Sequence, residues 1–488
     1  MAGIGFELKK IFAKKGVLNS VKAYGYAAVI CAGPMLLGIL LLLGITGLCM
    51  VAGTDLHTRE LLISMITHTL LASTAITAFF SSVVTRFIAD MLFAENHGAV
   101  LPVFWGSTVI MMVLGDFFYG GFLVVSGATL LQWVLCFTLF GELIIVWNAM
   151  NFLSAIKDYK GIFVSFLTSI AVSILVGAVL LALRLPVLES LLFAVTVGYG
   201  VMLIWDVILL HRYFPNTKGG AFSFLRWVDS FLPLALSSLF MTVGMFSHIV
   251  IMWYSDIGAR TSGLFFGSPW YDVPALLAFL TSVITTINFV VSVEVNFYPK
   301  YRTHYSLYND KGTIDNIKQA EREMLGTLRT ELFYSALKQL LFTAFIIALG
   351  GYLFDLLPLG FNEIMRGYFR TLCVAYGICA IGNMIMLILL YFTDYKGALI
   401  ATAAFAGSTV AFTLVSLLFS NVYYGFGFVI SSIVFTVVAV IRLDYFTKRL
   451  PYFILSVQPL VNEEKVGIFT KLGNFLKGNF EEEKNNEE

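Results

Sequence analysis

The chain has 488 residues and a formal net charge of +1, and apolar side chains dominate its composition. Hydrophobic residues make up 59% of the chain and charged residues only 12%, whereas a soluble globular protein has roughly 45–50% and about 25%. A water-soluble fold cannot hide that much apolar surface, and the small net charge gives no reason to expect a nucleic-acid partner. The composition therefore predicts a polytopic membrane protein without a sizeable soluble domain.

Twelve mostly apolar stretches are each long enough, at about 20 residues or more, to cross a bilayer as a helix. They cover residues 24–51, 61–84, 101–126, 128–155, 162–185, 190–214, 228–256, 273–298, 333–359, 371–394, 398–420 and 426–448. Gly115-Asp116 and Gly120-Gly121 predict a bend or break in the third helix. The expected fold class is all-α, with twelve transmembrane helices.

The positions of Lys and Arg predict how the chain is oriented. If the amino terminus is cytoplasmic and each span crosses once, five of the 31 basic residues fall on the outer side and the other 26 on the inner side. The five are Arg59, Arg184, Arg260, Arg366 and Arg370. Because twelve is an even number, both termini are expected in the cytoplasm.

These spans and loops divide the chain into seven segments. We expect a basic amphipathic amino terminus (1–23), a first six-helix bundle (24–214), a cytoplasmic loop (215–227), helices seven and eight (228–298), a cytoplasmic interfacial helix (299–332), helices nine to twelve (333–448), and a cytoplasmic tail with an amphipathic helix and an acidic end (449–488). The interfacial helix is predicted from apolar residues at helical spacing within a polar stretch.

The tetrapeptide Asp-Tyr-Lys-Gly occurs twice, starting at Asp158 and at Asp394, after the fourth and the tenth span. Such a repeat alone is weak evidence, but both copies fill the same inner turn, six helices apart. This placement predicts two six-helix bundles related by a pseudo-two-fold axis along the membrane normal. The two turns, which include Lys160 and Lys396, are candidate gates or hinges at the inner mouth. The alternative is that the motif is only a favourable tight turn.

Carboxylates within a membrane span cost free energy unless they find a partner, a proton or water. Four lie well inside predicted spans: Asp116, Glu142, Asp206 and Glu294. The predicted polar substrate pathway is lined by Asp116, Glu142, Asn148, Asn288 and Glu294. An alternative, at least as good for the asparagines, is that these residues join helices through hydrogen bonds.

No span carries Lys or Arg near its middle, although a flippase for a diphosphate-linked sugar is expected to present such groups to its anionic cargo. The chain has 45 Phe, 22 Tyr and 7 Trp instead. Most of these rings are expected to face lipid, but some are suited to stacking on sugar faces. The candidates for stacking are Trp105, Tyr119, Trp147 and Tyr376.

Four segments taken in order, MAGIGFELKKIF, TRFIADMLFAEN, VEVNFYPKYRTHY and TDYKGAL, resemble the PelG family of transporters in Pel exopolysaccharide biosynthesis. The resemblance covers essentially the whole chain. It implies the twelve-helix fold of the multidrug/oligosaccharidyl-lipid/polysaccharide (MOP) flippase superfamily, and a place in the bacterial inner membrane. It also implies an N-acetylgalactosamine-rich polymer as substrate. The implied partners are a cytosolic glycosyltransferase, a cyclic-di-GMP receptor in the membrane and a small membrane scaffold protein.

On this resemblance, the basic residues of the linker between spans eight and nine are suited to dock the cytosolic synthase. They are equally suited to hold anionic lipid headgroups. The residues are Lys300, Arg302, Lys311 and Lys318.

The leading hypothesis is a transporter that exports a polysaccharide from its cytosolic synthase through a cleft between the two bundles. The alternatives are a cation-coupled small-molecule antiporter on the same scaffold and a membrane scaffold for the synthase complex. An enzyme is not expected, because no Ser-His-Asp set, metal-ligand cluster or phosphate-binding loop appears. We therefore expect no cofactor and no metal, and we interpret the five cysteines as small buried hydrophobic residues.

Overall fold

The protein is described by a computed structural model that covers residues 37–309, 312–356, 361–456 and 466–487. The predicted amino-terminal segment 1–23, the first part of the predicted span 24–51, and Lys311 lie outside the described residues.

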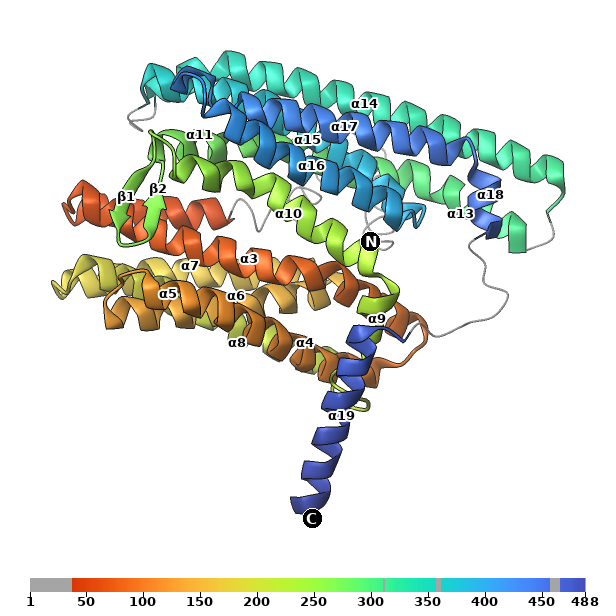
Figure 1. The fold of residues 1–488 in the computed structure, drawn as a ribbon, viewed down its shortest axis with the longest axis horizontal. Coiled ribbons are helices and arrows are strands. Elements are labelled where there is room, and N and C mark those ends of the chain that lie inside the picture. Colours follow the sequence, from red (N-terminus) through yellow and green to blue (C-terminus); the bar gives the residue numbers. More distant parts are fainter. Residues whose placement is uncertain (1–36, 310–311, 357–360, 457–465, 488) are drawn as a thin grey trace. The chain divides into compact units, whose positions relative to one another are not determined.

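The described residues include eleven helices that are long and apolar enough to cross a membrane. Their main helices are α3 (Leu56–Phe93), α4 (Val100–Gly115) with α5 (Gly121–Val125), α6 (Leu130–Ala155), α7 (Tyr159–Ala182), α8 (Val187–Tyr213), α10 (Leu232–Trp253), α11 (Pro269–Phe279) with α12 (Val283–Val291), α14 (Ile314–Leu356), α15 (Glu363–Tyr391), α16 (Tyr395–Ser416) and α17 (Phe426–Thr447) (Figure 1). A shorter apolar helix, Leu37–Val51, is the described part of the predicted first span. The all-α, multi-pass fold is confirmed.

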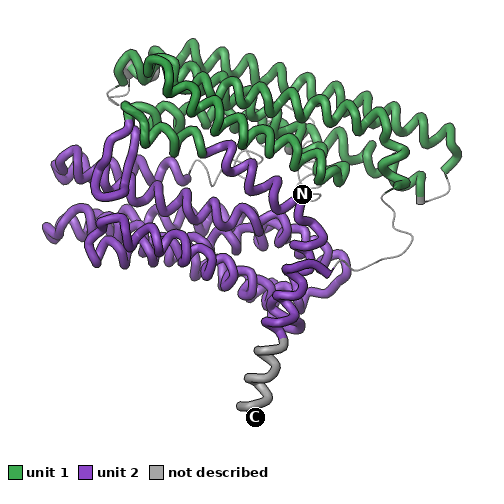
Figure 2. The backbone as a smooth tube through the Cα atoms, viewed as in Figure 1, with its two compact units in different colours: residues 1–33, 247–257, 269–459 green, residues 34–246, 258–268, 460–488 purple. Residues whose placement is uncertain are grey.

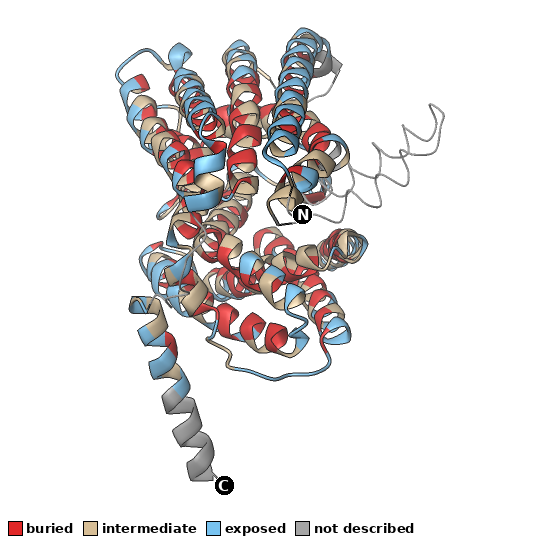
Figure 3. Ribbon diagram, turned by 90° about the vertical axis from the view of Figure 1, so that its right-hand side faces the viewer, coloured by how far each residue is buried: buried red, intermediate tan, exposed pale blue. Residues whose placement is uncertain are grey.

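The surfaces of these helices are apolar where they are exposed. Val113, Phe117 and Ile441 leave 64%, 75% and 63% of their surface uncovered, and Figure 3 shows exposed residues along the outer sides of the spans. A helix that is apolar on every side is stable where lipid, not water, covers the outer face. Each span is therefore apolar on all sides, because one side packs against neighbouring helices and the other contacts lipid.

Contacts divide the chain into two compact units (Figure 2). Unit 2 comprises residues 34–246, 258–268 and 460–488, and it contains Leu37–Val51 and the spans from α3 to α8. Unit 1 comprises residues 1–33, 247–257 and 269–459, and it contains the spans from α11 to α17. The boundary runs through α10, whose residues up to Phe246 belong to unit 2 and whose end belongs to unit 1.

Two spans contain a short π-helical segment. In the third span it runs from Asp116 to Gly120, between α4 and α5, where the glycines predicted a bend or break. In the eighth span it runs from Ser292 to Phe297, after α12. A π-helical turn widens the helix locally and is often found at functional positions. Each segment contains a carboxylate that the sequence singled out, Asp116 in one and Glu294 in the other.

The long helix α14 joins two segments that the sequence analysis separated. It continues from Ile314 to Leu356 with no interruption at the predicted boundary between residues 332 and 333. The polar linker is thus made of α13 (Tyr298–Asn309) and the first turns of α14. Lys300 of α13 pairs with Glu323 of α14 at 3.1 Å. No Pro or Gly pair interrupts residues 314–349, so nothing local ends the helix at the membrane surface.

A short β-hairpin, which the sequence analysis did not predict, connects α10 to α11. Strands β1 (Ala259–Ser262) and β2 (Phe265–Gly267) pair antiparallel. The hairpin lies against α3, where the Ser64 hydroxyl donates to the Phe266 carbonyl at 2.9 Å. The Leu264 amide donates to the Ser126 carbonyl beyond α5 at 2.8 Å. The hairpin is therefore part of unit 2, although the helices on either side of it enter unit 1.

The last helix, α19 (Ile468–Glu487), is attached to α9 (Leu225–Ser230) by one carboxylate. Asp229 accepts hydrogen bonds from the Phe469 amide at 3.3 Å and from the Thr470 amide and hydroxyl, each at 2.6 Å. The first amides of a helix have no partner within the helix. Asp229 therefore caps a helix that begins some 240 residues later in the chain.

The hairpin turn yields a prediction for its glycine. Gly263 has φ +54° and packs closely against Ser126. A Cβ at position 263 would lie 1.7 Å from the Ser126 carbonyl oxygen. We expect Gly263→Ala to lower stability by roughly 1–3 kcal/mol. Gly267→Ala is the control, because nothing lies within 4 Å of a Cβ there. Thermal unfolding of the detergent-purified variants measures the difference, and equal melting temperatures would contradict the close packing.

The cap of α19 yields a prediction for pH. Burial alone raises the pKa of Asp229, but the bonds from Thr470, Phe469 and Gly467 outweigh it and hold the pKa below its usual value. A lowered folded-state pKa stabilises the contact above pH of about 4 and loses that stabilisation as the pH falls through the folded value. We expect α19 to loosen on acidification, seen as falling anisotropy of a fluorophore on Lys471→Cys.

In the Asp229→Asn variant this acid step should be absent, because the amide does not titrate. An identical acid step in that variant would assign the titration to another group.

Candidate functional site

The polar residues of α6 point toward three neighbouring helices. Trp147 and Asn151 face α3: the Trp147 indole nitrogen donates to the Ser73 hydroxyl at 3.1 Å, and the Ser81 hydroxyl donates to the Asn151 side-chain oxygen at 2.9 Å. Trp147 and Asn151 are only half-buried. Together with the serines of α3 they form a polar and aromatic seam between α3 and α6.

Asn148, one residue after Trp147, faces α4 and is fully buried. Its side-chain nitrogen lies 3.2 Å from the Phe104 carbonyl and 2.9 Å from the hydroxyls of Ser107 and Thr108. These contacts hold α6 against α4. In the structure Asn148 thus joins two helices, the alternative that its sequence left open.

Glu142 lies on the side of α6 that meets α8. Its Oε2 atom is buried and has no hydrogen-bond partner within the part of the chain that the structure describes. Its Oε1 atom lies where a Cβ on Gly200 would approach to 3.0 Å, so glycine at that position leaves room for the carboxyl group. A half-buried carboxyl group with an unpaired oxygen inside a span is suited to hold a proton or a cation.

Asp206 of α8 is fully buried. Among the described residues neither of its carboxylate oxygens has a partner at good hydrogen-bond geometry, although the Ser165 hydroxyl of α7 interacts with it. Two fully buried hydroxyls on α7, those of Ser169 and Ser173, also have no partner among the described residues, and the Ser173 hydroxyl meets α8 at Gly198. Asp206 was recognised as an intramembrane carboxylate but left out of the predicted pathway. The signal that could have included it is the serine spacing of α7, with Ser165 one turn before Ser169.

The third span contributes Asp116, Tyr119 and Trp105, which the structure does not bring together. The Tyr119 hydroxyl lies 2.6 Å from that of Thr69, and its ring stacks on Phe140 at 4.6 Å inside unit 2. Asp116 is half-buried on the π-helical segment. Trp105 lies near the other end of α4 and leaves 40% of its surface exposed.

In unit 1, Tyr376 belongs to a buried aromatic cluster around His248. The His248 ring nitrogens lie 2.9 Å from the Tyr271 hydroxyl and 3.3 Å from the Tyr376 hydroxyl. Its ring stacks on Phe428 at 3.9 Å between centroids. The sequence analysis did not single out His248, although a lone histidine inside an apolar run was the available signal.

Asn288 of α12 faces α14, where the Lys338 ammonium group lies 3.5 Å from its side-chain oxygen. On the next residue of α14, the Gln339 amide nitrogen donates to the Thr281 carbonyl at 3.1 Å and to the Thr343 hydroxyl at 3.0 Å. These contacts form a second polar seam, between α12 and α14. The side chain of Glu294, on the π-helical segment that follows, lies outside the described residues.

The two Asp-Tyr-Lys-Gly turns have the same local structure. The Gly161 amide donates to Asp158 at 2.9 Å, and the Gly397 amide donates to Asp394 at 3.1 Å, so each aspartate caps the helix that follows. A Cβ on Gly161 or Gly397 would lie 2.5 or 2.0 Å from the capping carboxylate. Each motif is therefore a helix cap in which only glycine fits at the fourth position. Lys160 and Lys396 are exposed.

The turns differ in the second partner of the aspartate. In unit 2, the Tyr213 hydroxyl at the end of α8 donates to Asp158 at 3.2 Å. In unit 1, Arg442 of α17 binds Asp394 through two nitrogens, at 2.6 and 2.8 Å. Both partners lie on the helix that follows the capped one, so the correspondence extends beyond the tetrapeptide.

The predicted docking residues lie on α13 and the start of α14. Lys300 pairs with Glu323, and Arg302 and Lys318 are exposed. Among the described residues, no group of three or more His, Cys, Asp or Glu could hold a metal ion. The four described cysteines are buried free thiols.

Comparison with known proteins identifies relatives of the whole fold. A family model described as PelG, putative exopolysaccharide exporter, matches residues 1–455. Among curated proteins, none matches the sequence.

Among solved structures, an outward-facing MATE-family multidrug resistance transporter of the MOP superfamily superposes with a TM-score of 0.55 at 15% identity, covering 88% of this chain and 96% of the other. The inward-facing form of such a transporter gives 0.53 at 14% identity, covering 88% and 99%. A MOP-superfamily transporter from Pyrococcus furiosus gives 0.52 at 14% identity, covering 88% and 96%. At these identities the likeness shows a shared fold.

The two turns yield a prediction about their unequal partners. Asp394 is 6% exposed on its side chain, and Arg442 is 22% exposed. Arg442→Gln leaves a buried carboxylate without its countercharge, so we expect it to lower stability by roughly 3 kcal/mol. Tyr213→Phe, the matched change in unit 2, removes a single hydrogen bond and should cost about 1 kcal/mol or less. Melting temperatures of the purified variants test this, and losses of equal size would refute the assignment.

Proposed function

This chain belongs to the PelG family of putative exopolysaccharide exporters, and we propose that it exports a Pel-like, N-acetylgalactosamine-rich polysaccharide made by a cytosolic synthase. The family match carries the proposal, because it spans almost the entire chain. The shared fold adds support, since the superposed structures are themselves membrane transporters. The coarser statement, a multi-pass membrane exporter, follows from family and fold without further assumption.

The chemistry of the spans supports a neutral, sugar-rich cargo. The seam between α3 and α6 presents the Trp147 ring beside the hydroxyl of Ser73 and the amide of Asn151. Aromatic rings beside hydrogen-bonding groups are suited to carbohydrate, which presents apolar ring faces and polar edges. Transporters made of two such bundles carry their cargo between the bundles. We include this route in the proposal, together with Asp116, Glu142, Asn288, Glu294 and Tyr376 as pathway candidates.

The location and the partners are part of the same proposal. The segregation of Lys and Arg supports an inner-membrane protein with both termini in the cytoplasm. The family supports a cytosolic glycosyltransferase, a cyclic-di-GMP receptor and a small scaffold protein as partners. Lys300, Arg302, Lys311 and Lys318 are the proposed contact with the synthase or with lipid headgroups. The two capped turns, with Asp158, Lys160, Asp394 and Lys396, are proposed as hinges or gates at the inner mouth.

A second candidate activity, cation coupling, is favoured by one observation. Asp206 and Glu142 carry buried carboxylate oxygens for which the described residues offer no hydrogen-bond partner, and such groups in a span commonly take a proton or a cation. Coupling to an ion gradient would supply the energy for export, or would drive a small-molecule antiporter on the same scaffold.

Export is tested with vesicles that carry the transporter in their membrane and the cognate synthase on their outer surface. Polymer protected from an added glycosidase measures transport into the lumen. We expect Trp147→Ala to lower protected polymer by up to about tenfold, the factor that corresponds to 1.4 kcal/mol of stacking. Trp270→Ala, at an exposed ring of α11, is the matched control. Equal protection with and without the transporter would refute export.

The coupling hypothesis is tested in the same vesicles with and without a proton or sodium gradient. Asp206→Asn and Glu142→Gln should remove the response to the gradient while leaving assembly intact, because an amide cannot exchange a proton. If wild type and both variants respond equally to the gradient, these carboxylates do not couple transport.

A further inference from the structure

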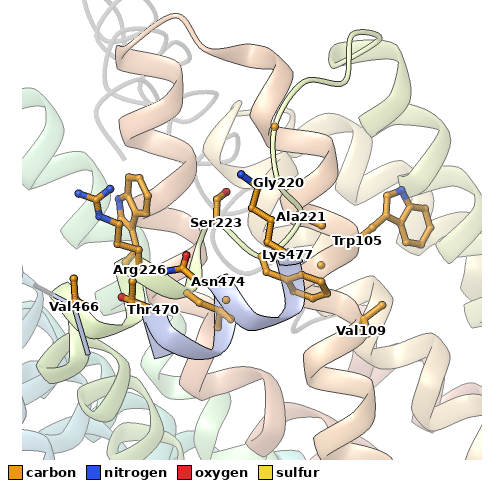
Figure 4. A pocket seen from close by; sticks show the side chains of 16 residues that line it. Trp105, Val109, Gly220, Ala221, Ser223, Arg226, Val466, Thr470, Asn474 and Lys477 are labelled. Carbon is orange, nitrogen blue, oxygen red and sulfur yellow. The ribbon is translucent and has the colours of Figure 1, made fainter. Parts of the chain in front are cut away.

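A pocket of about 930 Å³ lies within unit 2, beside the end of α4. One wall is α4, a second is the loop that leads into α9, and the third is α19 (Figure 4). The pocket is independent of the polar seams described above, since it shares no residue with them. Its position at the ends of helices, near the loop 215–227, places it at the membrane surface and not in the middle of the spans.

The two charged residues among the sixteen that line this pocket, Arg226 and Lys477, are both cations. The nearby carboxylates of Asp229 and Asp90 are not part of the lining and accept hydrogen bonds from Thr470 and Trp227. Arg226 of α9 and Lys477 of α19 project from two sides of it (Figure 4). Ser223, Thr470 and Asn474 add polar side chains, and no Asp or Glu is among the sixteen residues that line it. A pocket with two cations, hydroxyl groups and no carboxylate is complementary to an anion such as a phosphodiester.

The rest of the lining is apolar, which distinguishes this pocket from a site for a small soluble anion. Trp105 and Val109 contribute exposed apolar surface from α4, 40% and 50% uncovered. Phe222, Leu225 and Val466 continue that surface around the pocket. Tryptophan is typical of the boundary between headgroups and acyl chains, because its ring is apolar and its nitrogen is polar.

The wall formed by α19 has the features of a helix that lies in the membrane surface. Its inner side packs on unit 2, where Phe469 contacts Phe79 at 6.2 Å between ring centroids. Its outer side exposes three apolar residues one turn apart, Ile468, Leu472 and Phe475, at 81%, 43% and 64%. Figure 1 shows α19 running across the direction of the spans of unit 2. An amphipathic helix in this position is suited to the headgroup region of a bilayer.

We propose that this pocket binds the headgroup of an anionic glycerophospholipid. The phosphate lies between Arg226 and Lys477, and the acyl chains leave along Trp105 and Val109 toward the lipid-facing side of α4. The apolar stripe of α19 then rests in the same leaflet. Bound lipid would thus connect α19, which Asp229 holds at one end, to the spans of unit 2. This site does not depend on the cargo proposed above.

The test uses the full-length protein in detergent, titrated with phosphatidylglycerol or with phosphatidylcholine of the same chains and followed by native mass spectrometry. We expect phosphatidylglycerol to bind more tightly. The double variant Arg226→Gln/Lys477→Gln should bind it about 30-fold more weakly, since each basic residue contributes roughly fivefold. Lys448→Gln, at an exposed basic residue directly after α17, is the control and should leave the affinity unchanged.

A second variant separates lipid from free phosphate and from misfolding. Trp105→Ala keeps both cations, so it should weaken binding of the long-chain lipid while leaving the melting temperature within a few degrees. Millimolar inorganic phosphate should not displace the lipid. Equal affinity for the two lipids, unchanged binding in the double variant, or full displacement by inorganic phosphate would each overturn the proposal.

Discussion

The structure depends on one constraint: inside a bilayer every polar group must find its partner within the protein. Most of the chain meets it through helical backbone bonds. Many Ser and Thr side chains within spans bond a carbonyl of their own helix, and other polar side chains bond a neighbouring helix. Asn148 satisfies its amide nitrogen on α4, and Gln339 does so between α12 and α14. Among the described residues, Asp206 and the second oxygen of Glu142 are the buried carboxylate groups that lack a hydrogen-bond partner, alongside uncharged groups such as the Ser169 and Ser173 hydroxyls.

The same constraint explains what the sequence could predict. Each crossing needs a long apolar run, so the eleven spans found among the described residues, and their approximate limits, could be predicted from the apolar runs of the sequence. The ends of the helices are harder to predict from the sequence. Helix α3 extends from Leu56 to Phe93, well beyond the predicted 61–84, and α14 includes most of the predicted linker helix. Outside the apolar region, nothing but local helix preference decides where a helix stops, and here no proline or glycine pair stops it.

Long-range pairings could not be predicted. Asp229 caps a helix some 240 residues away, Arg442 binds a turn 48 residues earlier, and the hairpin lies on α3 some 200 residues before it. The repeated tetrapeptide is the exception, because the positions of its two copies in the sequence predict two equivalent turns. In both copies the aspartate caps the following helix and the glycine leaves room for the carboxylate. Local packing therefore explains why these two residue types occur in the motif. Whether the turns also gate transport is a separate proposal.

The central claim is that two six-helix bundles repeat in parallel, so that both turns lie on the same side of the membrane. Lys160 and Lys396 are exposed in their turns, while the described cysteines are buried. Labelling Lys160→Cys and Lys396→Cys in intact cells with a membrane-impermeant maleimide, before and after lysis, locates both turns. The account predicts that both positions are protected in intact cells and labelled after lysis. Labelling of one position but not the other from outside would contradict it.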